Sequence, residues 1–164
     1  MSVAAMLTAC GGKANKEVAK TASLIETATP IDSMLSQMGK HVGDTIAISG
    51  TVRHTCKHSG RRCFISGDDR SKSIRIEAGG NIGGFNKELI GSQIAVKGVV
   101  KEIRTTKEDF LKYRAELEAQ KAQGTEADHC ESSIGDIDAK LAKMEQDGKA
   151  YWSDYYLAGI DMEN

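Results

Sequence analysis

The sequence predicts a mainly β protein: a five-stranded barrel, with a short N-terminal helix and an α-helical hairpin inserted before the last strand. Two observations carry this prediction. Four segments between residues 45 and 106 are strand-like, and their clearest stretches alternate apolar and polar side chains with a period of two. Residues 107–147 instead repeat apolar side chains with a helical period, and an aromatic, β-prone segment follows at 151–162.

A short helix is expected before the first strand. Thr29 is a suitable cap, Pro30 fits the first turn, and Asp32 lies near the positive end of the helix dipole. We expect the helix to end at Gly39. Its apolar face would consist of Ile31, Leu35 and Met38.

The strand segments follow from Thr45 onward. Gly50 interrupts the first of them and predicts a bulge or a tight bend at that point. Asp68 and Asp69 belong to a turn by composition. Further strands are predicted at 63–67, 73–78 and 92–106, with one helical turn at Phe85–Leu89.

The helical hairpin at 107–147 is expected to pack on the barrel through Phe110 and Ile137, and Gly148 is expected to end its second helix. The apolar positions of its two helices are Phe110, Tyr113 and Leu117, then Ile134, Ile137, Leu141 and Met144.

The strand pattern resembles an OB-fold barrel, which has five strands, a helix between the third and fourth, and bent first and fourth strands. The segments "GDTIAISGTV" and "GSQIAVKGVV" share the G-x-x-I-x-V/I-x-G-x-V repeat of an OB strand. Together with the cysteines of the first hairpin, this plan resembles an uncharacterised family of exported bacterial OB-fold lipoproteins. The resemblance covers residues 42–106 and 151–162. It implies a fold and leaves the function open, because OB domains serve many functions.

The N-terminal "MSVAAMLTACGG" resembles the lipobox of bacterial lipoproteins, in which a peptidase cuts before the cysteine and the cysteine is acylated. This resemblance implies a signal remnant at 1–9, lipidation at Cys10, a lipidated tether at 10–29 and an OB-fold-like domain at 30–164. It also implies a location in the bacterial cell envelope, facing the periplasm or the surface, with the membrane as a partner through the lipid anchor.

The segment "HTCKHSGRRC" holds the densest chemistry of the chain. Unless a bulge at Gly50 reverses it, the parity of the first strand predicts that His54 and Cys56 face the barrel interior or its rim, with Cys63 on the facing strand. Three interpretations remain open. They are a hairpin disulfide between Cys56 and Cys63, a metal site for Zn or Cu formed by His54, Cys56, His58 and Cys63, and a reduced, buried cysteine pair.

Cys130 lies one turn before Ile134 in the second helix, which predicts a cysteine on the apolar face. The alternative is that His129 and Cys130 fold over the barrel mouth and add ligands to the cluster.

The chain of 164 residues has 22 basic and 23 acidic side chains, so a global nucleic-acid footprint is absent. Seven basic residues surround the first hairpin, but the sequence shows no stacking aromatic side chains among them, which argues against nucleic acid as the partner. The seven are Arg53, Lys57, Arg61, Arg62, Arg70, Lys72 and Arg75.

No enzyme motif is present, and we expect a binding domain instead of an enzyme. The first hypothesis is a lipid-anchored, exported OB-fold domain whose Cys/His cluster is a soft-metal site or a structural disulfide. The second is an OB module that binds a polyanion or another ligand, in which the cysteines are purely structural. The protein partner is not predicted.

Overall fold

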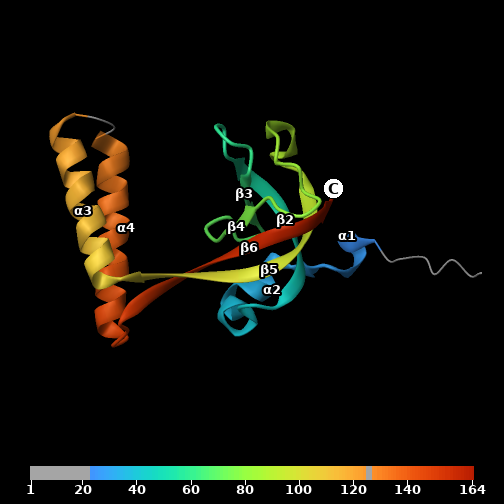
Figure 1. Ribbon diagram of the computed structural model, residues 1–164, viewed down its shortest axis with the longest axis horizontal. Coiled ribbons are helices and arrows are strands. Elements are labelled where there is room, and N and C mark those ends of the chain that lie inside the picture. Colours follow the sequence, from blue (N-terminus) through green and yellow to red (C-terminus); the bar gives the residue numbers. More distant parts are fainter. Residues whose placement is uncertain (1–22, 125–126) are drawn as a thin grey trace, which may run out of the picture.

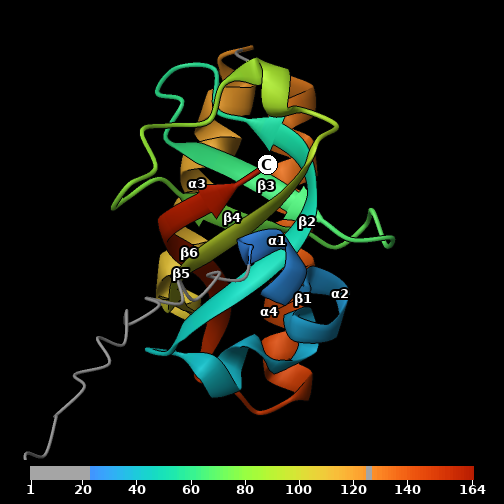
Figure 2. The same cartoon turned by 90° about the vertical axis from the view of Figure 1, so that its right-hand side faces the viewer.

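The computed structural model describes residues 23–124 and 127–164, so the predicted lipidation site at Cys10 lies outside the described residues. The mainly β class with an inserted helical hairpin is confirmed (Figures 1 and 2). The elements are α1 (Leu24–Thr27), β1 (Thr29–Pro30), α2 (Ile31–Met34), the 3₁₀ helix η1 (Leu35–His41), β2 (Thr45–Thr55), β3 (Arg62–Ser66), β4 (Ile74–Glu77), the 3₁₀ turn η2 (Lys87–Leu89), β5 (Gln93–Thr106), α3 (Lys107–Ala122), α4 (Ala127–Gln146) and β6 (Tyr151–Glu163).

Five of the strands close into a barrel. The sheet runs β1-β2-β3-β4-β6-β5, and β5 pairs again with β2, which removes the free edges of the five longer strands. All pairs in the closed ring are antiparallel except β4 with β6. This is an OB-like barrel, and β1 adds a two-residue parallel strand beside β2.

The barrel core is built from the inward positions of the strands. Ile65, Ile76 and Leu157 come from three neighbouring strands and are fully buried. Ile31 from α2 and Met38 from η1 join the same cluster, so the short N-terminal helix packs against the barrel core. The helix does not end at Gly39 as predicted, because the 3₁₀ helix η1 carries it to His41.

The irregularity predicted at Gly50 occurs three residues later. The pairing of β2 with β3 shifts register between Val52 and His54, which makes Arg53 the extra residue of a bulge. Gly50 is needed for a different reason: a Cβ there would lie 2.9 Å from the carbonyl oxygen of Ser66 and 3.1 Å from the side chain of Ile31.

The ends of β5 and β6 form a two-stranded ribbon beyond the barrel. From Glu102 to Thr106, β5 pairs with β6 alone among the described strands, and Thr106 lies opposite Tyr151. The ribbon carries α3 and α4 to one side of the barrel, and the chain's C-terminus lies on the other side (Figure 1).

The helical hairpin has its own apolar core. Phe110, Leu117 and Ile137 are buried in a cluster with Trp152 of β6 at its edge, and this cluster contains no residue of the barrel core. The prediction that Phe110 and Ile137 pack on the barrel is therefore wrong. Tyr113, predicted on the apolar face, is 48 % exposed.

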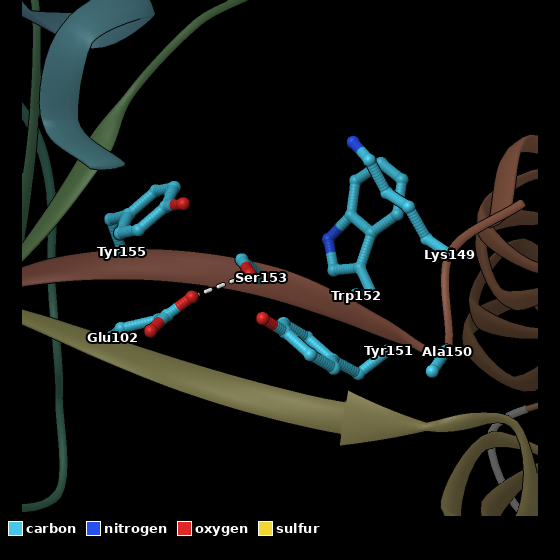
Figure 3. Close-up of a pocket in the computed structure, with 7 residues that line it drawn as sticks. All are labelled: Glu102, Lys149, Ala150, Tyr151, Trp152, Ser153 and Tyr155. Atoms are coloured by element: carbon cyan, nitrogen blue, oxygen red, sulfur yellow. Dashed lines mark hydrogen bonds between the residues drawn. The ribbon is translucent and has the colours of Figure 1, made fainter. Parts of the chain in front are cut away.

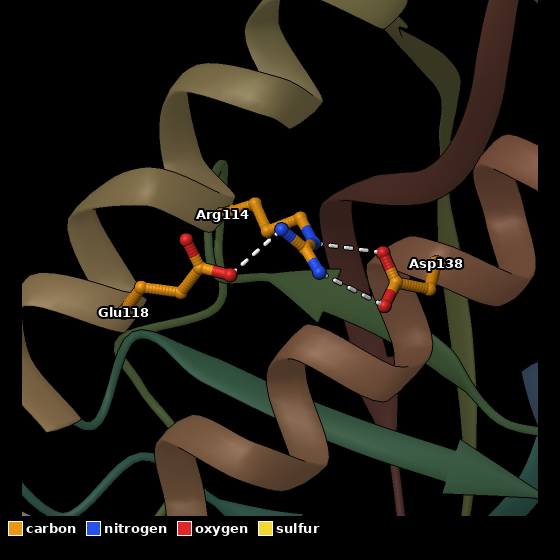
Figure 4. Close-up of polar contacts among 3 residues, drawn as sticks. All are labelled: Arg114, Glu118 and Asp138. Atoms are coloured by element: carbon orange, nitrogen blue, oxygen red, sulfur yellow. Dashed lines mark hydrogen bonds and ion pairs between the residues drawn. The ribbon is translucent and has the colours of Figure 1, made fainter.

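Polar contacts complete the hairpin. Thr106 and Asp109 form a reciprocal capping box at the start of α3. Arg114 links the two helices: it donates from Nε to Asp138 at 2.8 Å and from Nη1 to Glu118 at 2.7 Å (Figure 4). Gly148 follows α4 with φ of 63°, as the sequence predicts for a helix end. Neither helix is long and apolar enough to cross a membrane, nor is any other in the described part of the chain.

Candidate functional site

The bulge at Arg53 decides where the predicted Cys/His segment points. Val52 is buried and faces the core, but after the bulge the inward position falls on Thr55, which is 2 % exposed. His54 is exposed and Cys56 is half-buried. The predicted orientation of His54 and Cys56, toward the interior or its rim, holds only for an unbroken strand, and here one inserted residue reverses the alternation.

Cys56 and Cys63 lie one register step apart. Thr55 is the partner of Cys63 across the β2–β3 pair, whereas the backbone N–H of Cys56 donates to Arg62 at 2.9 Å. Neighbouring register positions send side chains to opposite faces, so Cys63 enters the core and Cys56 does not. Both thiols are free, and the hairpin disulfide is not formed in this structure.

The two thiols differ in acidity because Cys63 is buried in the core and Cys56 is not. Burial raises the pKa of Cys63 to about 12. The pKa of Cys56 is lowered, chiefly because the Ser59 hydroxyl hydrogen-bonds to it, with further help from the backbone N–H groups of Ser59 and His58. Cys63 is an inert core residue, and Cys56 is the more nucleophilic of the two.

The remaining candidate ligands lie elsewhere. His58 is exposed in the turn after β2, and His129 is exposed on α4. Cys130 is 1 % exposed in the hairpin cluster, on the apolar face as its spacing from Ile134 predicts, so it does not fold over the barrel mouth. Across residues 23–124 and 127–164, no three His, Cys, Asp or Glu side chains are placed to hold a metal ion. The predicted Zn or Cu centre is not assembled.

A row of side chains crosses the outer face of the barrel instead, and we call it the cross-strand ladder. Its members are successive register partners on β2, β3, β4, β6 and β5: His54 pairs with Phe64, Phe64 with Arg75, Arg75 with Tyr156, and Tyr156 with Lys101. Each faces outward because its strand neighbours, such as Cys63, Ile65, Ile76 and Leu157, are buried.

The ladder combines rings and cations, in the order His54, Phe64, Arg75, Tyr156 and Lys101. The rings of His54 and Phe64 have centroids 6.0 Å apart, and the Arg75 guanidinium lies 4.6 Å over the Tyr156 ring. Both contacts are in the range of favourable ring–ring and cation–π interactions. The Nε atom of Arg75 is buried and has no hydrogen-bond partner among the described residues, so this guanidinium retains an unused donor.

Charge is concentrated around the ladder. Residues 53–77 contain seven Arg or Lys and three Asp or Glu, a net charge of +4, whereas the rest of the chain has 15 basic and 20 acidic residues. Glu77 lies beside the ladder and pairs with Arg62 at 3.2 Å and Arg75 at 3.5 Å. One carboxylate is therefore shared by two guanidinium groups.

The sequence did not reveal Phe64 and Tyr156 as candidate site residues, because they are 92 positions apart and meet through Arg75. The outward orientation of His54 was not predicted either, because an unbroken alternation would place this residue toward the interior and the bulge reverses it. In the folded chain Phe64 lies beside Arg75 and Tyr156 joins them from β6, so aromatic rings do lie among the basic residues. The signal available in the sequence was the alternation of β3, which sends Phe64 outward once Cys63 and Ile65 are assigned to the core.

Neither known protein families nor curated proteins match this chain.

Proposed function

We propose that this protein is a binding module that takes a single-stranded polyanion with planar rings, the chemistry of single-stranded nucleic acid, on the outer face of its barrel. The observation that supports the proposal is the cross-strand ladder, in which outward rings and cations lie side by side across five strands. Proteins that bind single strands without sequence preference combine stacking rings with a positive groove.

Each part of the ladder has a task in this proposal. Phe64 and Tyr156 offer ring faces to successive bases, and the positive charge of Arg75 between them attracts the phosphates. Lys101 is the last member of the ladder, on β5, and Arg62 on β3 is 56 % exposed. Both add positive charge that can pair with further phosphates of the ligand.

The test is fluorescence anisotropy of a labelled fifteen-nucleotide deoxythymidine strand with the full chain at two salt concentrations. We expect saturable binding that weakens as salt rises, because phosphate contacts release counterions. Phe64→Ala should lose about 1–3 kcal/mol of binding free energy, the usual contribution of one stacked base. Arg75→Ala should weaken binding and reduce the dependence on salt.

Tyr113→Ala is the matched control, since Tyr113 is an exposed ring on α3, outside the ladder. It should bind as the unaltered protein does. Equal binding of polyphosphate, with no effect of Phe64→Ala, would show that the face is a plain polyanion surface and that the rings are not used.

Cys10 supports a second, independent proposal: the chain is an exported lipoprotein anchored through this residue. Mass spectrometry of the protein from a bacterial envelope should find Cys10 as the acylated N-terminus. An unprocessed Met1 or a free Cys10 thiol would contradict the proposal.

A further inference from the structure

A pocket of about 440 Å³ lies where the β5–β6 ribbon meets the helical hairpin, and none of its lining residues belongs to the cross-strand ladder. Its size is within the range of small-molecule sites. Figure 3 shows Tyr155, Ser153 and Trp152 along the ribbon, with Glu102 on the neighbouring strand and Tyr151 near the root of the hairpin. Three of the chain's eight aromatic side chains, including its single Trp, therefore line one pocket.

The walls of this pocket are held in place by contacts outside it. The indole of Trp152 donates from Nε1 to Asp154 at 3.0 Å and packs against the hairpin cluster. Tyr155 packs against the barrel core, and its hydroxyl is so close to Gly39 that a Cβ there would lie 2.7 Å away. Such fixed walls lower the entropy lost when a ligand binds.

The polar groups of the pocket are also fixed. Glu102 is 15 % exposed; it accepts a hydrogen bond from the Ser153 hydroxyl at 2.6 Å and one from Arg104 Nε at 2.9 Å. These donors lower the pKa of Glu102, so the carboxylate is ionised and retains lone pairs that can accept further hydrogen bonds.

Every charged group at the pocket has a partner of opposite sign. Glu102 pairs with Arg104, and Lys149 pairs with Asp147 at 3.5 Å. Lys140, which lies 5.5 Å over the Trp152 ring, pairs with Asp154 at 3.2 Å. A charged ligand would find no uncompensated countercharge here, whereas an uncharged ligand with hydroxyl groups and flat apolar faces would find rings and acceptors.

We propose that this pocket binds a neutral sugar. The apolar C–H face of a pyranose ring packs on the indole of Trp152 and on Tyr155, while its hydroxyl groups donate to Glu102 and accept from Lys149. Tyr151, which is 37 % exposed, closes the rim of the pocket. The site is independent of the proposed polyanion face and does not rest on it.

The test uses the single Trp as the reporter. The full chain is titrated with maltotriose, cellotriose and chitotriose, with the fluorescence of Trp152 as one readout and isothermal titration calorimetry as the second. We expect a saturable response to at least one of the three. Inorganic phosphate and tetramethylammonium, as anionic and cationic probes, should give none.

Two variants locate the binding. Tyr151→Ala removes an exposed ring that belongs to neither buried cluster, and it should weaken the calorimetric affinity by about tenfold or more. Glu102→Gln should weaken it as well, because an amide replaces one of the acceptor oxygens with a donor. Tyr113→Ala, an exposed tyrosine outside the pocket, is the control and should bind as the unaltered protein does.

The proposal is overturned by no saturable response to any of the three trisaccharides, or by sugar affinities that Tyr151→Ala and Glu102→Gln leave unchanged. Binding of a charged probe that Tyr151→Ala abolishes would also overturn it, because the pocket would then select charge.

Discussion

The barrel and the helical hairpin are stabilised in different ways. Among the described residues, the barrel core joins 16 buried residues from strands, helices and loops between Ile31 and Leu157, whereas the hairpin core has five, all from two adjacent helices. The two cores share no residue, and the strand side chain that packs against the hairpin cluster in the described part of the chain is Trp152. The barrel therefore depends on contacts between distant parts of the chain, and the hairpin depends on local ones. We expect the two to unfold as separate cooperative units.

The largest expected effect is destabilisation of the barrel by Leu157→Ala. Leu157 is fully buried and belongs to the strand that closes the ring with β4 and β5. Truncation should lower the free energy of unfolding of the barrel by about 2–5 kcal/mol, measured by urea denaturation. The circular dichroism of the hairpin helices should persist beyond the loss of barrel amide protection. Simultaneous loss of both signals would show that the molecule is one cooperative unit.

Ile137→Ala makes the converse test. Ile137 is 4 % exposed at the centre of the hairpin cluster, and its truncation should destabilise the hairpin by about 2–5 kcal/mol. Hydrogen exchange should quicken in α3 and α4 and stay unchanged in β2 and β3. Faster exchange in the barrel strands would contradict the separation of the two cores.

The buried thiol of Cys63 makes the stability of the barrel depend on pH. Its pKa is about 12 in the folded protein against an ordinary value of 9.0, so the thiol is neutral in both states below pH 9. Above that the unfolded chain ionises first, and stability falls as pH rises from 9 toward 12. The loss is about 1 kcal/mol near pH 10. A Cys63→Ala variant should lack this part of the pH dependence, measured as the free energy of unfolding between about pH 8 and pH 10. Equal pH dependence in both proteins would contradict this role of Cys63.

The smallest expected effect is on the barrel when residues 107–147 are replaced by a short Gly/Ser link. Because the hairpin core shares no residue with the barrel core, the barrel should lose about 1 kcal/mol or less. Thermal unfolding followed by near-ultraviolet circular dichroism measures this change. A barrel that no longer folds would show that the hairpin belongs to its core.

The sequence predicts most of the fold because its periods are local. Residues 45–55, 93–106 and 107–122 alternate or repeat as their elements require, and β6 was recognised by its aromatic composition. The position of the hairpin was not predictable in this way. An apolar helical face must pack on something, but the sequence does not state whether the partner is the barrel or the other helix.

The candidate site was less predictable, and the bulge at Arg53 is the reason. Sequence alternation is reliable only while the strand is unbroken, and one extra residue exchanges the assignments of His54 and Thr55. A bulge leaves little local signal, and Gly50 drew attention to the wrong position. The ladder was hidden for another reason, because the parallel pairing of β4 with β6 brings Arg75 to Tyr156 across the whole chain.

The two ends of the described chain meet at one pole of the molecule. The Ser23 hydroxyl hydrogen-bonds to the Glu163 carboxylate at 2.8 Å. Helix α1 and the C-terminus lie on the side of the barrel away from the hairpin (Figure 1). A partner fused directly after the last strand therefore leaves the barrel at the pole where the described chain enters at Ser23. The helical hairpin lies on the opposite side of the barrel, so such a fusion would leave the hairpin uncovered.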